Sequence, residues 1–289
     1  KRQILSILIV LTIVLTSFCA TGFATEERAA LPTLTVDMKN EQHNIIHGAA
    51  GFLYGISNEG VPDVNTLTPL KPKVLATKGA LGTEHPYGDA LDVAEEFFEA
   101  GGEQVQMYNS NYYGVFGVTA DAYDYADVLK NIICPEVVAW KEKIRDRFPD
   151  IDKMLQYIPI NESTPIKVSG SKNYNEAWKI YYKAIKEADP NATVVGPNHA
   201  YDPSYNEMLG FLNFCKTNDC LPDVITWHEL QVSDLNNLNI NNTNNSIQRY
   251  RSAARDAGVE EKQVVINEYA DFADCGVPGL SLIHISVPT

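Results

Sequence analysis

Met154-Leu-Gln-Tyr-Ile-Pro-Ile160 is a short apolar run that ends in the polar, acidic pair Asn161-Glu162. The segment before it, from Asp121 to Phe148, has the composition and length of a helix, which Pro135 is expected to divide into two pieces. The segment after it has apolar residues at helical spacing, namely Ala177, Trp178, Tyr181, Ala184, Ile185 and Ala188. A short apolar run between two helical segments is typical of a buried strand in a parallel sheet.

The same alternation extends in both directions along the chain. Further strands are predicted at Gly48–Ile56, Lys73–Thr77, Gln104–Tyr108, Thr193–Gly196, Val224–Trp227 and Val264–Ile266. Further helices are predicted at Ala90–Ala100, Tyr205–Lys216 and Ile247–Ala257, and the Asn-rich stretch Asn236–Asn245 is predicted to be a loop. Repeated strand-helix units indicate an α/β fold with a parallel sheet.

We predict a (β/α)8 TIM barrel that is truncated after about its seventh strand, because no eighth strand can be assigned. An open doubly wound sheet would fit the alternation equally well. However, no glycine-rich fingerprint follows the first strand, so nothing supports nucleotide binding.

The two ends of the chain are expected to lie outside the barrel domain. Residues 1–24 combine Lys1 and Arg2 with an apolar run and small residues, which is the layout of a secretory signal peptide. Residues 25–44 form an N-terminal segment, 45–279 the incomplete barrel, and 280–289 are interpreted as a non-native tail. We therefore expect a secreted, extracellular protein without a membrane anchor once the signal peptide is removed.

Charge and cysteine content narrow the class of partner. The formal net charge of −14 argues against nucleic acid, whose phosphates require clusters of Lys and Arg. An uncharged polymer remains a permitted partner, and the oligomeric state is left open. After signal removal, Cys215 and Cys220 flank a short polar loop, so either a local disulfide or two free thiols would fit.

Acidic residues that close a predicted barrel strand are the strongest catalytic candidates, because barrel active sites lie at the C-terminal ends of the strands. Two fit this condition. Glu162 follows the fourth strand, and Glu268 follows the seventh in Val264-Val-Ile-Asn-Glu-Tyr269. They lie 106 residues apart (268 minus 162), about three strand-helix units. A retaining glycosidase needs such a pair, one carboxyl as acid/base and one as nucleophile.

The Asn-Glu dipeptide by itself is a weak signal, since it occurs six times. Glu176 and Glu207 fall in or beside predicted helices, where a solvated surface glutamate is the usual outcome. Glu59 is the main competitor, because it follows the apolar run Gly51–Ile56 at the end of the first strand.

Five motifs together resemble the large clan of retaining glycosidases on (β/α)8 barrels. They are Gly51-Phe-Leu-Tyr-Gly55, Pro159-Ile-Asn-Glu162, Val194-Val-Gly-Pro197, Asp223-Val-Ile-Thr-Trp-His228 and Val265-Ile-Asn-Glu-Tyr269. Within this clan the chain is most similar to the β-xylosidase and α-L-iduronidase family, over about residues 45 to 272. Leu230 departs from that family, which often has a tyrosine at this position.

The resemblance implies that Glu162 is the acid/base and Glu268 the nucleophile. It also implies that Asn161 binds the 2-hydroxyl of the sugar and that His228 contacts the sugar or a catalytic carboxylate. A half-buried structural histidine is the alternative for His228. Further substrate contacts are expected from four residues: Trp227, Tyr269, His85 and Asn109. For Trp227, packing in the barrel wall is the alternative to stacking on a sugar, and it is slightly favoured.

The predicted function is that of a secreted glycosidase, hydrolysing plant or microbial oligosaccharides or polysaccharides by double displacement, with neither metal nor organic cofactor. A secreted barrel that binds carbohydrate without catalysis is the alternative. Serine and zinc hydrolases have little support, since there is no Gly-x-Ser-x-Gly and His228-Glu229 lacks the second histidine of a zinc helix.

Overall fold

The computed structural model describes residues 50–57, 60–114, 121–162, 167–168, 171–231 and 242–271. All of them belong to the compact unit formed by residues 46–289. The predicted signal peptide, the C-terminal tail, Glu59 and Cys275 lie outside the described residues. Among the described helices, none is long and apolar enough to cross a membrane.

Seven parallel strands form one sheet, in which each strand pairs with the next along the chain. They are β1 (Gly51–Leu53), β2 (Val74–Lys78), β3 (Gln104–Tyr108), β4 (Leu155–Ile158), β7 (Thr193–His199), β8 (Val224–Gln231) and β9 (Val264–Asp271). Residues of β9 lie close to β1 and β2, so the sheet curves into a nearly closed barrel. The strand order never reverses, which confirms the TIM-barrel prediction and excludes a doubly wound sheet.

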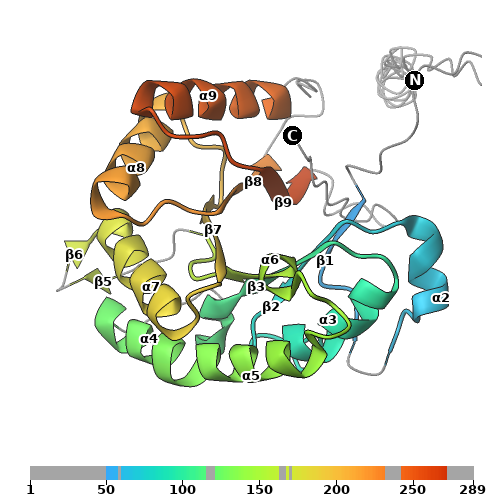
Figure 1. Cartoon of the computed structure of the whole chain (residues 1–289). Coiled ribbons are helices and arrows are strands. Elements are labelled where there is room, and N and C mark those ends of the chain that lie inside the picture. Colours follow the sequence, from blue (N-terminus) through green and yellow to red (C-terminus); the bar gives the residue numbers. More distant parts are fainter. Residues whose placement is uncertain are drawn as a thin grey trace, which may run out of the picture. The chain divides into compact units, whose positions relative to one another are not determined.

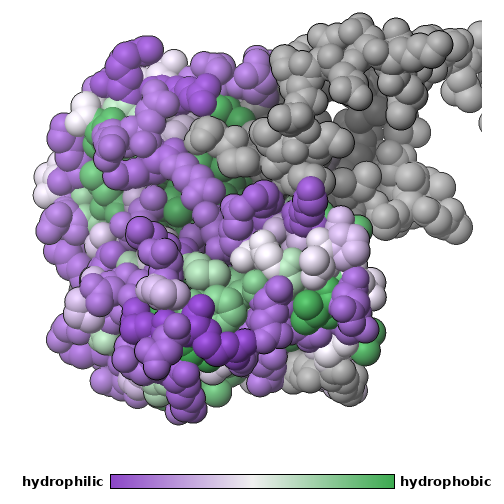
Figure 2. All heavy atoms as spheres, turned by 45° about the vertical axis from the view of Figure 1, so that its right-hand side comes forward, coloured by the Kyte–Doolittle hydropathy of each residue, from purple (hydrophilic) through white to green (hydrophobic). Residues whose placement is uncertain are grey.

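The main helices surround the strands as a ring (Figure 1). The α-helices are α2 (Val64–Leu67), α3 (Ala90–Glu99), α4 (Ala122–Val128), α5 (Cys134–Ile144), α6 (Ile151–Met154), α7 (Tyr174–Ala188), α8 (Tyr205–Asn218) and α9 (Asn242–Ala257). Short 3-10 turns η1 (Thr68–Leu70) and η2 (Asn109–Tyr113), and a small antiparallel pair β5 (Lys167–Val168) and β6 (Ser171–Lys172), join the larger elements. On the face shown in Figure 2, the described surface is mainly hydrophilic, with small separate hydrophobic patches.

Side-chain alternation along the strands produces two cores. One cluster fills the barrel interior and contains Val74, Ala76, Tyr108, Ile158, Val195, Val224 and Val265. The residues between them, such as Leu75, Met107 and Ile225, point outward and pack under the helices. Inward-pointing residues at the C-terminal ends of the strands therefore share one site above the inner core.

The segment from Asp121 to Phe148 differs from the expectation of two separate helices. Residues Leu129–Ile133 form a π-helical turn, η3, that joins α4 to α5 without a gap. Pro135 lies in the first turn of α5, where its missing N–H costs least. The proline is thus accommodated by a local change of helical pitch rather than by a break.

The predicted loop Asn236–Asn245 is wrong at its end, because α9 begins at Asn242. Asparagine and threonine are tolerated in a first helical turn, where four backbone N–H groups have no partner within the helix. The buried Ser246 in α9 donates a hydrogen bond to Glu229 of β8, which ties this end of the helix to the barrel.

The three cysteines among the described residues, Cys134, Cys215 and Cys220, are buried free thiols. Of the two alternatives for Cys215 and Cys220, the structure therefore contains two free thiols and not a disulfide. The loop between them is closed by a backbone hydrogen bond of 3.0 Å from Cys220 to Cys215, and Trp178 donates to the Cys220 carbonyl at 2.8 Å.

Candidate active site

Two carboxylates and one imidazole meet at the C-terminal end of the barrel. Glu162 follows β4, Glu268 lies in β9, and His228 lies between them in β8. His228 Nδ1 is 3.3 Å from Glu162 Oε1 and 3.5 Å from Glu268 Oε2. One ligand atom from each of the three residues lies within 4.8 Å of the other two. The two glutamates that the sequence singled out are therefore brought together.

Burial differs among the three residues. The His228 side chain is 0% exposed, that of Glu268 is 13% exposed and that of Glu162 is 23% exposed. Burial raises the pKa of the Glu268 carboxyl, and the charges of Glu162 and Glu84 raise it further. His228 and the Tyr108 hydroxyl act in the opposite direction. The pKa of Glu268 is thus set by groups from several strands of the barrel.

Glu162 has an unusual backbone conformation. Its φ angle is 51°, in the left-handed region that non-glycine residues seldom adopt. Its backbone N–H donates to the carbonyl of Asn198 at 3.0 Å, and Asn198 has a φ of 55°. Two adjacent strand ends therefore hold each other in the geometry that presents the Glu162 side chain.

Asn198 links the two Asn-Glu pairs. Its Nδ2 donates to Asn161 Oδ1 at 2.7 Å, and its Oδ1 accepts from Asn267 Nδ2 at 2.9 Å. Thr226 of β8 contacts the same Oδ1 at 3.4 Å. Asn198 is completely buried. It therefore positions the residues that precede both glutamates, and it couples β4, β7, β8 and β9.

A third carboxylate lies near the pair. Glu84, in the loop after β2, accepts hydrogen bonds from the Tyr54 hydroxyl at 3.3 Å and from Asn111 Nδ2. Burial raises its pKa, and the charge of Glu162 raises it as well. The ring of Tyr54 lies against Tyr108 of the inner core, with centroids 6.2 Å apart. Glu84 is thus connected to Glu268 through Tyr54, which bonds Glu84, and Tyr108, whose hydroxyl acts on Glu268.

The structure separates three predicted contact residues from this site. Trp227 is completely buried beneath α9, where its Nε1 donates to Glu229 at 3.1 Å and its ring contacts Tyr250. Its substrate role is wrong because strand alternation turns it away from the side of His228. Tyr269 packs against the outer core for the same reason. Asn109 is completely buried at the start of η2, so its side chain is not accessible for the substrate contact predicted for it.

His85 and Asn161 do lie near the carboxylates. His85 Nε2 is 3.8 Å from Glu84 Oε1, and its ring contacts that of Tyr54 at 4.7 Å. Asn161 precedes Glu162 and bonds Asn198. The Asn-Glu pairs with Glu176 and Glu207 lie in the first turns of α7 and α8, where Glu207 completes a capping box with Ser204.

Four residues of the site were not predicted: Tyr54, Glu84, Tyr108 and Asn198. Tyr108 ends a predicted strand, and Glu84 and Asn198 follow two others, so the strand-end criterion applied to all polar residues would have included these three. Tyr54 lies inside the predicted strand Gly48–Ile56, whereas β1 ends at Leu53. The signal was weak because Tyr54 and Tyr108 read as ordinary apolar strand residues.

The two carboxyl groups can act on the same bond of a substrate, one as acid/base and the other as nucleophile. The two carboxyl groups are close enough to face the same bond from two sides, and His228 can donate an N–H to one of them. Glu162, His228 and Glu268 also form a set that could hold a metal ion.

No protein-family model matches the chain. It is 27% identical over 304 residues to 3-O-beta-L-arabinopyranosyl-alpha-L-arabinofuranosidase of Bifidobacterium pseudocatenulatum, with 86% of this chain and 30% of that protein covered. It is 27% identical over 311 residues to 3-O-alpha-D-galactosyl-alpha-L-arabinofuranosidase of Bifidobacterium longum subsp. longum, with 88% and 26% covered. The chain thus spans less than a third of these relatives.

Solved structures share the barrel. N2152 from Neocallimastix frontalis matches with a TM-score of 0.59 and 26% identity, over 78% of this chain and 53% of that one. A monomeric beta-xylosidase from Caulobacter crescentus CB15 matches with a TM-score of 0.51 and 13% identity, over 81% and 54%. The narrower β-xylosidase and α-L-iduronidase family stays a prediction. The chain is a homologue of glycoside hydrolases and has their TIM-barrel fold.

Proposed function

We propose that the protein is a retaining glycosidase that hydrolyses α-L-arabinofuranosyl bonds. The observation that carries the proposal is the pairing of Glu162 and Glu268 across His228 at the open end of the barrel, with their ligand atoms within 4.8 Å. The sugar follows from the two Bifidobacterium relatives, both named arabinofuranosidases.

The spacing of the carboxyl groups supports retention over inversion. Retaining enzymes hold the two groups about 5 to 5.5 Å apart, whereas inverting enzymes leave about 6.5 to 9.5 Å for a water molecule. A carboxylate oxygen of Glu162 lies within 4.8 Å of one of Glu268, which agrees with the shorter spacing of retaining enzymes.

In the first step, the Glu268 carboxylate attacks the anomeric carbon while the Glu162 carboxyl donates its proton to the leaving oxygen. The carbon–oxygen bond breaks and a glycosyl ester forms on Glu268. In the second step, the Glu162 carboxylate removes a proton from water, which attacks the same carbon and releases Glu268. Two displacements leave the anomeric configuration unchanged.

Product stereochemistry tests this function. The protein should hydrolyse 4-nitrophenyl α-L-arabinofuranoside, and proton NMR of the first product should show the α-anomer before mutarotation. First appearance of the β-anomer would contradict the retaining mechanism. Saturable sugar binding without release of nitrophenol would favour the alternative of a non-catalytic carbohydrate-binding barrel.

The acidic limb of the pH profile should respond in opposite directions to two substitutions. Activity requires ionised Glu268, so kcat/KM falls as the pH drops through the pKa of this group. Tyr108→Phe removes a contribution that lowers this pKa, so the limb should move to higher pH. Glu84→Gln removes a charge that raises it, so the limb should move to lower pH.

Tyr205→Phe provides the matched control, because Tyr205 bonds Asp256 on the exposed surface. Its kcat/KM profile should overlay that of the parent. Shifts of Tyr108→Phe and Glu84→Gln in the same direction would show that Glu268 does not control the limb.

Removal of divalent metals should leave the activity unchanged. Double displacement uses only the two carboxyl groups, although Glu162, His228 and Glu268 could also hold an ion. Dialysis against EDTA followed by the nitrophenol assay measures this. A loss of activity that one added divalent metal restores would contradict the proposed roles of both glutamates.

We also propose that the protein is exported and acts on oligosaccharides or polysaccharides outside the cell. Support comes from the signal-like layout of residues 1–24. Recovery of the protein, cleaved near residue 24, from the medium of the producing cell would test export.

A further inference from the structure

Glu84 is a third carboxylate at the mouth of the barrel, and the proposed double displacement does not use it. It lies in the loop between β2 and α3, and its side chain is 12% exposed. A carboxylate that is withdrawn from water loses hydration, which costs free energy unless other groups solvate its charge. The partners of Glu84 therefore show how far this loss is compensated within the protein.

The two carboxylate oxygens of Glu84 have different surroundings. Oε2 accepts hydrogen bonds from the Tyr54 hydroxyl at 3.3 Å and from Asn111 Nδ2. Oε1 faces His85 Nε2 at 3.8 Å, which exceeds the roughly 2.7–3.2 Å of an N–H···O hydrogen bond. Within the described part of the chain, Oε1 is thus left without a hydrogen bond, although a carboxylate oxygen has room for more than one.

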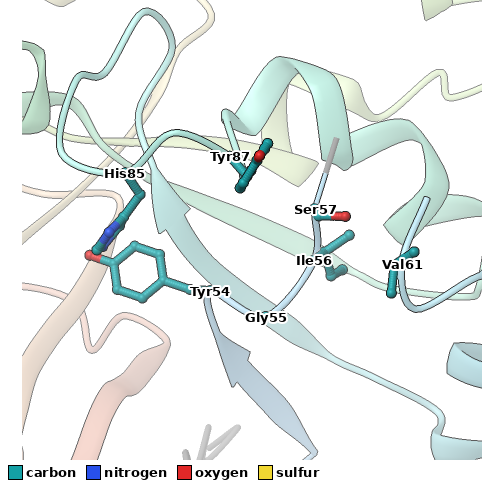
Figure 3. A pocket seen from close by; sticks show the side chains of 8 residues that line it. Tyr54, Gly55, Ile56, Ser57, Val61, His85 and Tyr87 are labelled. Atoms are coloured by element: carbon teal, nitrogen blue, oxygen red, sulfur yellow. The ribbon is translucent and has the colours of Figure 1, made fainter. Parts of the chain in front are cut away.

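His85 is held in position but remains accessible. Its ring packs edgewise against that of Tyr54, with centroids 4.7 Å apart and planes at 77°. Figure 3 shows these two side chains facing each other, with Tyr87 of the same loop set apart from them. The His85 side chain is 46% exposed, so its imidazole is open to a ligand. The opening between Glu84 Oε1 and His85 Nε2 is therefore bounded by one carboxylate oxygen and one imidazole nitrogen.

This opening lies beside the two proposed catalytic glutamates. Burial raises the pKa of Glu268, and the charges of Glu162 and Glu84 raise it further. Tyr54, which bonds Glu84, has its ring centroid 6.2 Å from that of Tyr108. The Tyr108 hydroxyl in turn acts on Glu268. Glu84 is thus a neighbour of the reaction centre, with two tyrosines between it and Glu268.

The proposed mechanism decides which part of a substrate meets the opening. The anomeric carbon lies at Glu268 and the leaving oxygen at Glu162, so the transferred sugar occupies the Glu268 side. The strand before the Glu84 loop, β2, lies close to β9, which holds Glu268. In contrast, β3 separates β2 from β4, the strand that Glu162 follows. The opening therefore faces the transferred sugar and not the leaving group.

One hydroxyl of an arabinofuranosyl residue fits this position best. The 2-hydroxyl is next to the anomeric carbon and so lies beside Glu268, not beyond two tyrosines. The 5-hydroxyl is separated from the anomeric carbon by more bonds than either ring hydroxyl, and its carbon extends outside the ring. A hydroxyl can donate its hydrogen to Glu84 Oε1 and accept one from His85 Nε2 when this nitrogen is protonated.

We propose that Glu84 and His85 bind the 5-hydroxyl of the arabinofuranosyl residue that is transferred to Glu268. The inference rests on the proposed function and specifies it, because it names the contact that selects a furanose. A sugar without this hydroxyl leaves a largely buried acceptor unpaired, which costs more than the lost hydrogen bond alone. A pentopyranose is disfavoured for the same reason, since its C5 lies inside the ring and carries no hydroxyl.

Three substrates and four proteins test this inference. The substrates are 4-nitrophenyl α-L-arabinofuranoside and its 5-deoxy and 3-deoxy analogues. The proteins are the parent, Glu84→Gln, His85→Ala, and Tyr87→Ala as the control. Tyr87 lies in the same loop and is 54% exposed, so its replacement shows what disturbance of the loop alone does. The assay is run above the acidic limb, so that the shift of this limb in Glu84→Gln does not enter.

The parent should lose about tenfold to hundredfold in kcat/KM on the 5-deoxy analogue, the size of a hydrogen bond to a charged group. On the unmodified substrate, Glu84→Gln and His85→Ala should each lower kcat/KM by about threefold to tenfold. On the 5-deoxy analogue, both variants should lie within about twofold of the parent, because the contact is already absent. On the 3-deoxy analogue they should keep their full loss. Tyr87→Ala should stay within about twofold of the parent on all three substrates.

The outcomes separate this inference from the proposed function. If Glu84→Gln and His85→Ala lose as much on the 5-deoxy analogue as on the unmodified substrate, neither side chain binds the 5-hydroxyl, and the proposed function stands. If their losses vanish on the 3-deoxy analogue instead, the pair binds the 3-hydroxyl and the assignment to C5 is wrong. If the parent cleaves none of the substrates, the proposed function fails and the inference fails with it.

Discussion

Replacement of Glu268 by alanine should reduce kcat for an aryl α-L-arabinofuranoside by about 10⁴-fold or more, the size seen when a covalent nucleophile is removed. Glu268 is 13% exposed, and its Oε2 lies 3.5 Å from His228 Nδ1, which is itself 3.3 Å from Glu162 Oε1. Among the described residues, Glu268 is the carboxylate that groups with Glu162 and His228. Glu162→Ala should cost about 10² to 10⁴-fold, and less with a good leaving group, because nitrophenol needs little protonation.

Azide distinguishes the two roles. With Glu268→Gly, azide should restore turnover and yield the glycosyl azide of inverted configuration, since it attacks directly in place of the carboxylate. With Glu162→Ala, azide should intercept the ester on Glu268 and yield the retained configuration. Exchange of these two products between the variants would reverse the assignment.

Glu176→Ala is the matched control. Glu176 also follows an asparagine, but it lies in the first turn of α7 and pairs with Lys179 at the surface. Its activity should stay within about twofold of the parent, because surface ion pairs contribute little. If Glu162→Ala and Glu268→Ala were equally mild, neither glutamate would be catalytic.

The second large effect concerns stability. Lys141→Ala should lower the free energy of unfolding by about 3 to 5 kcal/mol, because it leaves a buried carboxylate without its cation. Lys141 is 1% exposed, and its Nζ lies 2.7 Å from Asp189 and 3.3 Å from Asp152. The hydroxyl of Tyr157, a residue of β4, also donates a hydrogen bond to Asp189 at 2.9 Å.

Urea unfolding followed by circular dichroism measures this loss. Lys130→Ala is the control, since Lys130 pairs with Glu187 at the surface and should cost no more than about 1 kcal/mol. Adding Asp189→Asn to Lys141→Ala should recover part of the stability, because it removes the unpaired charge. Equal losses for Lys141→Ala and Lys130→Ala would show that the buried cluster adds nothing beyond a surface pair.

Local pattern predicted most of the barrel. The third strand, Gln104–Tyr108, has the predicted bounds, and α3 ends within one residue of its prediction. These strands and helices can be predicted because each strand is a short apolar segment and each helix has one periodic apolar face that is buried. Bounds were least accurate where polar residues continue an element, as in β9, which extends to Asp271.

The sequence by itself determined the succession of strand-helix units and the strand-end positions of Glu162 and Glu268, because hydrophobic period and strand-end location are local properties. The pairing order of the strands decided between the barrel and an open doubly wound sheet. Tertiary structure alone decided which side chains join the two glutamates. Trp227 and His228 are neighbours in the chain, yet strand alternation buries one under α9 and places the other between the carboxylates. Asn198, Glu84 and Tyr54 come from distant segments, and only closure of the sheet brings them to the same site.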